Sequence, residues 1–281
     1  MTAYQFEVTE SFKEELNIAL IAVRKASTIA AKDFFETRQL LVSQKGTVDF
    51  VSITKKKIER EIIKCLQKYR PEIGIVSEEQ KLKGSALSTY NWIINPIDGL
   101  FNFMHGLPFF CISIALVESC NGKVEALLGV VHNPVTDETF FARKGQGART
   151  GPKINNCKKI TASNVIKLER MICVVDLHKV DRDLHVKKYL ERILQTNSSG
   201  FRLLGSTALE LAYLADSRIN LAIYDDLSPW DYVAGMLIMQ EAGNIAVDLQ
   251  NNPIDLNKSK TSLIASNRKM LQVFASDVAA K

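Results

Sequence analysis

Three acidic residues, Glu78, Asp98 and Asp231, each come soon after a short apolar run typical of a buried strand. Strand ends present side chains to a shared cleft, and magnesium binds one or two carboxylates together with waters and substrate phosphate. Two such ions about 3.5–4 Å apart stabilise the attacking and leaving oxygens of phosphoryl transfer. Asn95, in the same run as Asp98, is a neutral amide where two-metal chemistry would use a second carboxylate. The sequence therefore predicts a cleft for a cation and a phosphate, with one ligand altered.

Each acid taken alone also fits a structural role. Asp98 fits a turn or a helix N-cap, and Glu78 and Asp231 fit capping or surface positions. Asp98 and Asp231 both precede or open an expected helix, where free N–H groups and the helix dipole favour phosphate. The single residues leave both interpretations open, so the surrounding patterns have to decide.

Composition places the chain among ordinary globular proteins. It has 281 residues, a net charge of +5, 46% hydrophobic and 24% charged residues, which is enough to bury a large core. Lys55, Lys56 and Lys57 precede Glu59 and Glu61, a pattern that indicates a solvated helix face rather than a nucleic-acid patch. No signal peptide and no apolar run of roughly 18 residues is visible, so we expect a cytoplasmic, soluble protein.

The cysteines and histidines do not form a metal or disulfide pattern. The five cysteines are odd in number, and no two have C-x-x-C spacing. Free thiols in a reducing compartment are therefore expected, rather than disulfides or a zinc site. The cysteines are Cys65, Cys111, Cys120, Cys157 and Cys173.

The elements that must position the acids mix helices with strands. A capping box at Ser11–Glu14 predicts a long helix, and a second helix is expected from about Lys56 to Tyr69, ended by Pro71. Turns near Asn121-Gly122 and Asn133-Pro134 indicate a meander of antiparallel strands. Together these patterns favour an α+β fold. Strands are expected at 73–76, 92–94, 110–116, 126–131, 138–142, 171–175, 221–224, 245–247 and 263–265, and further helices at 208–215 and 232–242.

Several motifs together resemble the inositol monophosphatase family, magnesium-dependent and lithium-sensitive phosphatases, and in particular its bacterial branch of extragenic suppressor proteins. The resemblance covers nearly the whole chain. It implies a layered α-β-α-β-α sandwich, a single domain over 1–281 with two packed lobes of approximately 1–155 and 156–281, and a homodimer. The motifs are Ser43–Gly46, Asp49–Val51, Ser77–Glu79, Ile94–Gly99, Asn102–Phe103, Leu107–Phe109, Lys144–Ala148, Gly205–Ala208 and Pro229–Asp231.

The resemblance also implies roles for individual residues. Glu78, Asn95, Asp98 and Asp231 stand at the positions of metal ligands, and Ile97 would contribute its backbone carbonyl to magnesium. Glu78 would also help to activate the attacking water. The substrate would be held by the amides of Gly99 and Leu100, by Gly205, Ser206 and Thr207, and by Asp231.

This sequence departs from the family pattern at the catalytic positions. Asn95 replaces a bridging aspartate, while Lys55 and Leu100 replace the aspartate and threonine that activate water. Five carboxylates at positions 55, 78, 95, 98 and 231 would carry −5, whereas three acids and one lysine carry −3 + 1 = −2. Tyr224 stands where a substrate-contacting glutamate is common, although Asp225 beside it could partly compensate. We therefore expect weakened magnesium binding and impaired or absent phosphatase activity.

Two questions stay open at this stage. Lys55 either reaches Glu78 or Asp98 and replaces a metal's charge, or points to solvent. The chain is a scaffold for hydrolysis of inositol or sugar phosphate monoesters with activity impaired or lost, or still an active phosphatase. The alternative is a non-catalytic regulator of transcription or ribosome production, like members of the extragenic suppressor branch, with a partner in the transcription machinery or an RNA.

Overall fold

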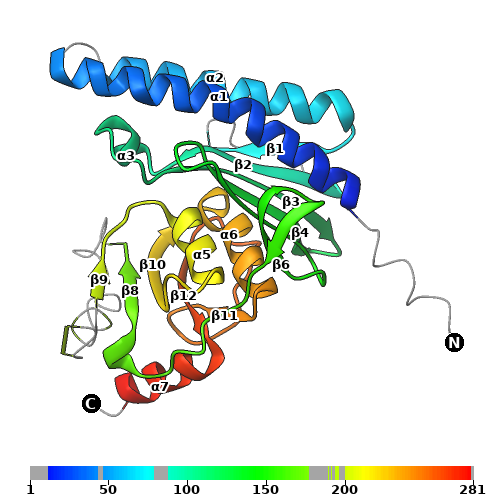
Figure 1. The fold of residues 1–281 in the computed structure, drawn as a ribbon. Coiled ribbons are helices and arrows are strands. Elements are labelled where there is room, and N and C mark those ends of the chain that lie inside the picture. Colours follow the sequence, from blue (N-terminus) through cyan, green and yellow to red (C-terminus); the bar gives the residue numbers. More distant parts are fainter. Residues whose placement is uncertain are drawn as a thin grey trace, which may run out of the picture.

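The computed structural model describes residues 12–43, 47–78, 88–176, 189, 191, 194–195 and 200–279. Ser11, residues 44–46 of one predicted motif, and Glu79 lie outside this part of the chain. Five layers follow one another: a helix pair, a seven-stranded sheet, a second helix pair, a five-stranded sheet and a final helix (Figure 1). This arrangement confirms the α+β class and the expected α-β-α-β-α sandwich.

The first layer is formed by α1 (Lys13–Ser43) and α2 (Thr47–Tyr69), which lie side by side along the outer face of the large sheet (Figure 1). Their apolar faces share one buried cluster with β2, β3 and β4, including Ala19, Ile62 and Trp92. Helix α2 begins nine residues before the predicted start at Lys56, because Val51 packs in the same buried cluster as Ile58.

The large sheet is a meander with one parallel strand at its edge. Its order follows the sequence, and β1 pairs in parallel with β2 while every other neighbouring pair is antiparallel. Helices cover both faces, which explains why β2 is buried along nearly its whole length. The strands are β1 (Gly74–Ser77), β2 (Tyr90–Asp98), β3 (Cys111–Cys120), β4 (Lys123–Asn133), β5 (Glu138–Arg143), β6 (Ala148–Lys153) and β7 (Asn156–Lys159), with helix α3 (Leu100–Met104) after β2.

The second half builds the smaller sheet and the helices between the sheets. Strand order is β11-β12-β10-β8-β9. Helices α5 and α6 lie between the two sheets, and α7 packs on the opposite face of the small sheet through Met270, Leu271 and Phe274 (Figure 1). The elements are β8 (Ile172–Val175), β9 (Gly200–Arg202), α5 (Thr207–Ala215), β10 (Leu221–Leu227), α6 (Pro229–Glu241), β11 (Asn244–Val247), β12 (Thr261–Asn267) and α7 (Arg268–Ala279).

This packing brings the ends of several strands and the starts of several helices together. Ser77 pairs with Ile94 in the parallel β1–β2 register, so Glu78 follows alongside Asn95 at the carboxyl end of both strands. The starts of α5 and α6 reach the same region, because Ser206 bonds to Asp98 just before α3 and Asp231 bonds to Asn95. All five cysteines are free thiols, as predicted. No helix within the described residues is long and apolar enough to span a membrane.

Candidate active site

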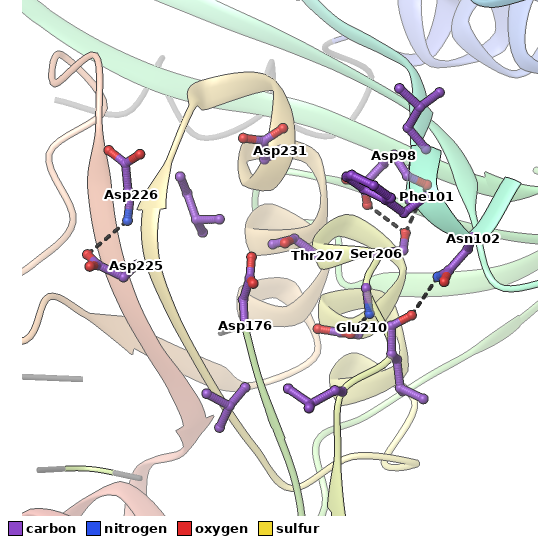
Figure 2. A pocket seen from close by; sticks show the side chains of 17 residues that line it. Asp98, Phe101, Asn102, Asp176, Ser206, Thr207, Glu210, Asp225, Asp226 and Asp231 are labelled. Atoms are coloured by element: carbon purple, nitrogen blue, oxygen red, sulfur yellow. Dashed lines mark hydrogen bonds between the residues drawn. The ribbon is translucent and has the colours of Figure 1, made fainter. Parts of the chain in front are cut away.

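A cavity of about 530 Å³ lies where these ends meet (Figure 2). Six of its lining residues are acidic, and none of the described lining residues is a lysine, arginine or histidine. An anionic ester entering this cavity is therefore repelled unless a cation is present. The lining residues are Asp98, Gly99, Leu100, Phe101, Asn102, Val175, Asp176, Leu203, Leu204, Gly205, Ser206, Thr207, Glu210, Asp225, Asp226, Leu227 and Asp231.

Asp98 ends β2 and is held firmly by the start of α5. Its Oδ2 accepts hydrogen bonds from the Ser206 hydroxyl at 2.6 Å and from the Ala208 amide at 2.9 Å. Burial and the nearby charge of Asp231 nevertheless raise the pKa of Asp98 to about 8. A cation bound beside Asp98 would favour its charged form and so oppose this rise in pKa.

Asp231 reaches the same cavity from the first turn of α6 (Figure 2). Its Oδ2 accepts the backbone N–H of Ser228 at 2.9 Å, which fixes the side chain at the helix start. Burial and the charge of Glu78 raise the pKa of Asp231 to about 6, although the bond from Ser228 lowers it. Asp231 thus lies within electrostatic reach of both Asp98 and Glu78.

Asn95 connects β2 to Asp231. Its Nδ2 donates to Asp231 Oδ1 at 3.3 Å, across 136 residues of sequence. The side chain is 2% exposed, and its Oδ1 has no hydrogen-bond partner among the described residues. A buried carbonyl oxygen without a hydrogen-bond partner is unfavourable. The Asn95 oxygen therefore still has the capacity to accept a hydrogen bond or to bind a cation. Ile97, the predicted backbone ligand, buries its side chain in the cluster beneath α1 and α2.

Lys55 points inward and not to solvent. Its residue is 6% exposed, and its Nζ lies 2.8 Å from Glu78 Oε1. The interpretation of the lysine run as a solvated helix face is therefore wrong for Lys55. Glu78, which directly follows strand β1, supplies the counterion that lets this ammonium lie away from solvent. The predicted contact with Glu78 is confirmed. Neither residue lines the cavity itself.

The turn after Asp98 requires glycine. Gly99 has φ of 91°, and a Cβ there would lie 3.0 Å from the Phe109 carbonyl oxygen and 3.1 Å from that of Gly205. Asn102 holds the same loops together, since its Nδ2 donates to the carbonyls of Phe109 and Leu204 at 2.7 and 2.6 Å. Leu100 lines the cavity with carbon atoms alone, so it cannot accept a proton from water.

Sequence reasoning missed Glu210, Asp176 and Phe101, all of which line the cavity (Figure 2). Glu210 is buried in α5; it accepts the Gly205 amide at 2.9 Å and the Tyr224 hydroxyl at 2.6 Å. Burial raises the pKa of Glu210 to about 7, against the effect of these bonds. The available signal was an acid in the first turn of an otherwise apolar helix.

The structure shows in part whether Asp225 can replace the substrate-contacting glutamate that was expected at position 224. Tyr224 is fully buried and bonds to Glu210, and it is not among the lining residues. Asp225 does line the cavity, where its carboxylate accepts the Ser262 hydroxyl and the Asp226 amide. An acid is therefore present near the expected place, on the neighbouring residue.

Asp98 and Asp231 are two predicted metal ligands that line the cavity. Within the described part of the chain, no group of three or more histidine, cysteine, aspartate or glutamate side chains is arranged to hold a metal ion. Carboxylates are oxygen ligands of the kind that magnesium takes together with waters, but the Asn95 amide turns its nitrogen, and not its oxygen, to Asp231. Glu78 is instead paired with an ammonium.

Comparison with known proteins agrees with this architecture. The family model described as the inositol monophosphatase family matches residues 12–281. The inositol-1-monophosphatase of Caulobacter vibrioides is 33% identical over 251 residues, covering 89% of this chain and 94% of that protein. The Nus factor SuhB of Escherichia coli is 35% identical over 236 residues, covering 83% and 84%.

A solved structure shares the whole fold. The extragenic suppressor protein suhB from Bartonella henselae superposes with a TM-score of 0.81 at 30% identity, covering 95% of this chain and 98% of that one. The family match thus spans the described elements of both sheets and every residue of the candidate site. This chain belongs to the inositol monophosphatase family.

Proposed function

We propose that the cavity binds a small phosphate monoester, of an inositol or a sugar, and that the chain hydrolyses it slowly or not at all. One observation carries the second half of this proposal. The two positions expected to activate water hold Lys55, whose ammonium is 2.8 Å from Glu78, and Leu100, whose side chain is carbon alone. Neither side chain can take a proton from water at neutral pH.

The binding half rests on the remaining polar groups. Asp98, Asp231 and the Asn95 oxygen would hold magnesium, which supplies positive charge for the phosphate in an otherwise acidic cavity. The amides of Gly99 and Leu100 would contact phosphate oxygens. Ser206, Thr207 and Asp225 line the cavity and would bind the hydroxyls of a polyol. The name inositol-1-monophosphatase, carried by the relative from Caulobacter vibrioides, supports this substrate class.

The expected loss of rate is large. Removing one well-placed general base or electrostatic contributor commonly costs roughly 10²–10⁴-fold in rate. Three altered positions, 55, 95 and 100, act on the same water and the same charge, so their effects do not simply multiply. Turnover far below that of an intact site is nevertheless expected.

The test is a phosphatase assay on a panel of inositol and sugar phosphates with magnesium. The wild-type chain should show little or no turnover, and the combined variant Lys55→Asp, Asn95→Asp and Leu100→Thr should show more. Lys56→Asp, an exposed change next to Lys55 on the same helix, is the control for added acidity. Rapid wild-type turnover that Asp98→Ala abolishes would overturn the proposal of impaired activity.

The alternative is a non-catalytic role in transcription. It is supported by relatives named Nus factor SuhB, from Escherichia coli and Haemophilus influenzae, at 35% and 34% identity. This role needs no turnover, so it is compatible with the altered positions. A stable complex with purified RNA polymerase in gel filtration, formed by wild type and by Asp98→Ala alike, is the expected result; no complex would refute it.

A further inference from the structure

The ammonium of Lys55 is a buried positive charge beside the cavity. Lys55 lies on α2, and its side chain is 7% exposed against 35% for its partner Glu78. Withdrawing an ammonium from water is strongly unfavourable unless a counterion compensates it. Glu78 Oε1, 2.8 Å away, supplies such a counterion.

The neighbouring lysine shows that this placement is specific. Lys57 is two residues further along α2, and its ammonium contacts Asp33 at 3.4 Å while remaining about half exposed. The same helix therefore offers one lysine turned toward the strand ends and one turned toward α1. The two side chains carry equal charge and differ in what they face.

Lys55 already supplies a positive charge at the Glu78 carboxylate. A divalent ion bound to the same carboxylate would lie close to this ammonium, and like charges repel strongly where burial reduces screening by water.

The geometry separates two positions. At the first, the Glu78 carboxylate is already bonded to Lys55 Nζ. At the second, Asp98 and Asp231 line the cavity, and the 98% buried Asn95 amide points its nitrogen to Asp231 Oδ1 while its oxygen has no partner in the described structure. Because the Asn95 nitrogen faces Asp231, its oxygen would join these two carboxylates around an ion only after the amide rotates.

We propose that Lys55 is a resident cation that closes the ion position at Glu78, so that the chain binds one divalent ion, between Asn95, Asp98 and Asp231. This inference rests on the proposed function only in taking the cavity as a phosphate site that needs positive charge. It makes the ammonium a fixed replacement for one ion of a two-ion site.

The test counts bound manganese, a spectroscopic substitute for magnesium, by electron paramagnetic resonance titration of the intact chain. Wild type should bind one ion per chain. Lys55→Asp should bind two, because it removes the ammonium and adds a ligand. Lys55→Met removes the charge with little change of volume and should bind a weaker second ion. Lys57→Met, the matched control, should still bind one.

The outcomes separate cleanly. Wild type binding two ions or none would overturn the proposal, as would Lys55→Met and Lys55→Asp each staying at one ion while circular dichroism shows them folded. If Lys55→Asp does not fold, the count for Lys55→Met decides. The readout is independent of turnover, so rapid phosphatase activity of wild type would refute the proposed function and leave the ion count to be judged separately.

Discussion

Replacing Asn95 by aspartate should make the stability of this protein depend on magnesium. In the wild type, Asn95 Nδ2 donates to Asp231 Oδ1 at 3.3 Å. The variant Asn95→Asp puts two carboxylate oxygens at that separation in a buried place. At an effective dielectric constant of about 20, two unit charges 3.3 Å apart repel by roughly 5 kcal/mol.

Proton uptake limits this penalty. Holding one aspartate protonated at pH 7, when its ordinary pKa is about 3.9, costs about 4 kcal/mol. We therefore expect Asn95→Asp to lose about 2–4 kcal/mol without divalent ions, which for a chain of this length lowers Tm by roughly 3–7 °C. The loss should grow as pH rises, because the folded pair has the higher pKa and binds the proton more tightly than the unfolded chain.

Magnesium should reverse the loss. An ion present at about 100 times its Kd stabilises the folded state by about 2.7 kcal/mol. The assay is thermal unfolding of wild type and variant, with EDTA and with magnesium, at pH 6 and pH 8. Magnesium should raise Tm more for the variant than for wild type, and the difference between the two proteins in EDTA should be larger at pH 8.

Asn257→Asp is the matched control. Asn257 also donates its Nδ2 to an aspartate, Asp255 Oδ1 at 2.9 Å, but this pair is exposed. Solvent screens the new repulsion there, so Tm should change little and magnesium should have no specific effect. If Asn95→Asp in EDTA were as stable as wild type, or if both variants responded equally to magnesium, the inferred electrostatics of the cavity would be wrong.

Three further predictions concern stability. Burial lowers the pKa of His132 from 6.5 to about 4. The unfolded chain therefore binds the proton more tightly, and the stability of the folded state falls as pH drops between these values. His132→Gln should remove about 2 kcal/mol of the difference between the unfolding free energies measured in urea at pH 7 and at pH 5. Burial raises the pKa of Glu210 from 4.5 to about 7, so stability falls as pH rises between these values, and Glu210→Gln should raise Tm at pH 8 more than at pH 5. A Cβ at Gly129 would lie 2.6 Å from the Ala234 carbonyl oxygen of α6, so Gly129→Ala should lower the unfolding free energy by about 1–3 kcal/mol, and an unchanged value would contradict this close packing.

Local patterns identified most of the elements. Apolar runs and turn residues located the strands, because a buried strand and its turn leave short-range signals. The start of α2 was less accessible: Thr47–Lys55 mixes polar and β-branched residues, and its helical state depends on packing against α1. The cavity residues Glu210 and Asp176 carried weak signals, because only the tertiary packing of α5 and β8 brings them to the same cavity.

The sequence by itself determined the family pattern, the three acids at strand and helix ends, and the losses at positions 55, 95 and 100. These are statements about residue types and spacing, which the chain carries before it folds. Only the tertiary structure decided where the Lys55 charge lies. The direction of a long side chain depends on which counterion a distant segment supplies, and β1 places Glu78 where its carboxylate makes the buried position of that ammonium favourable.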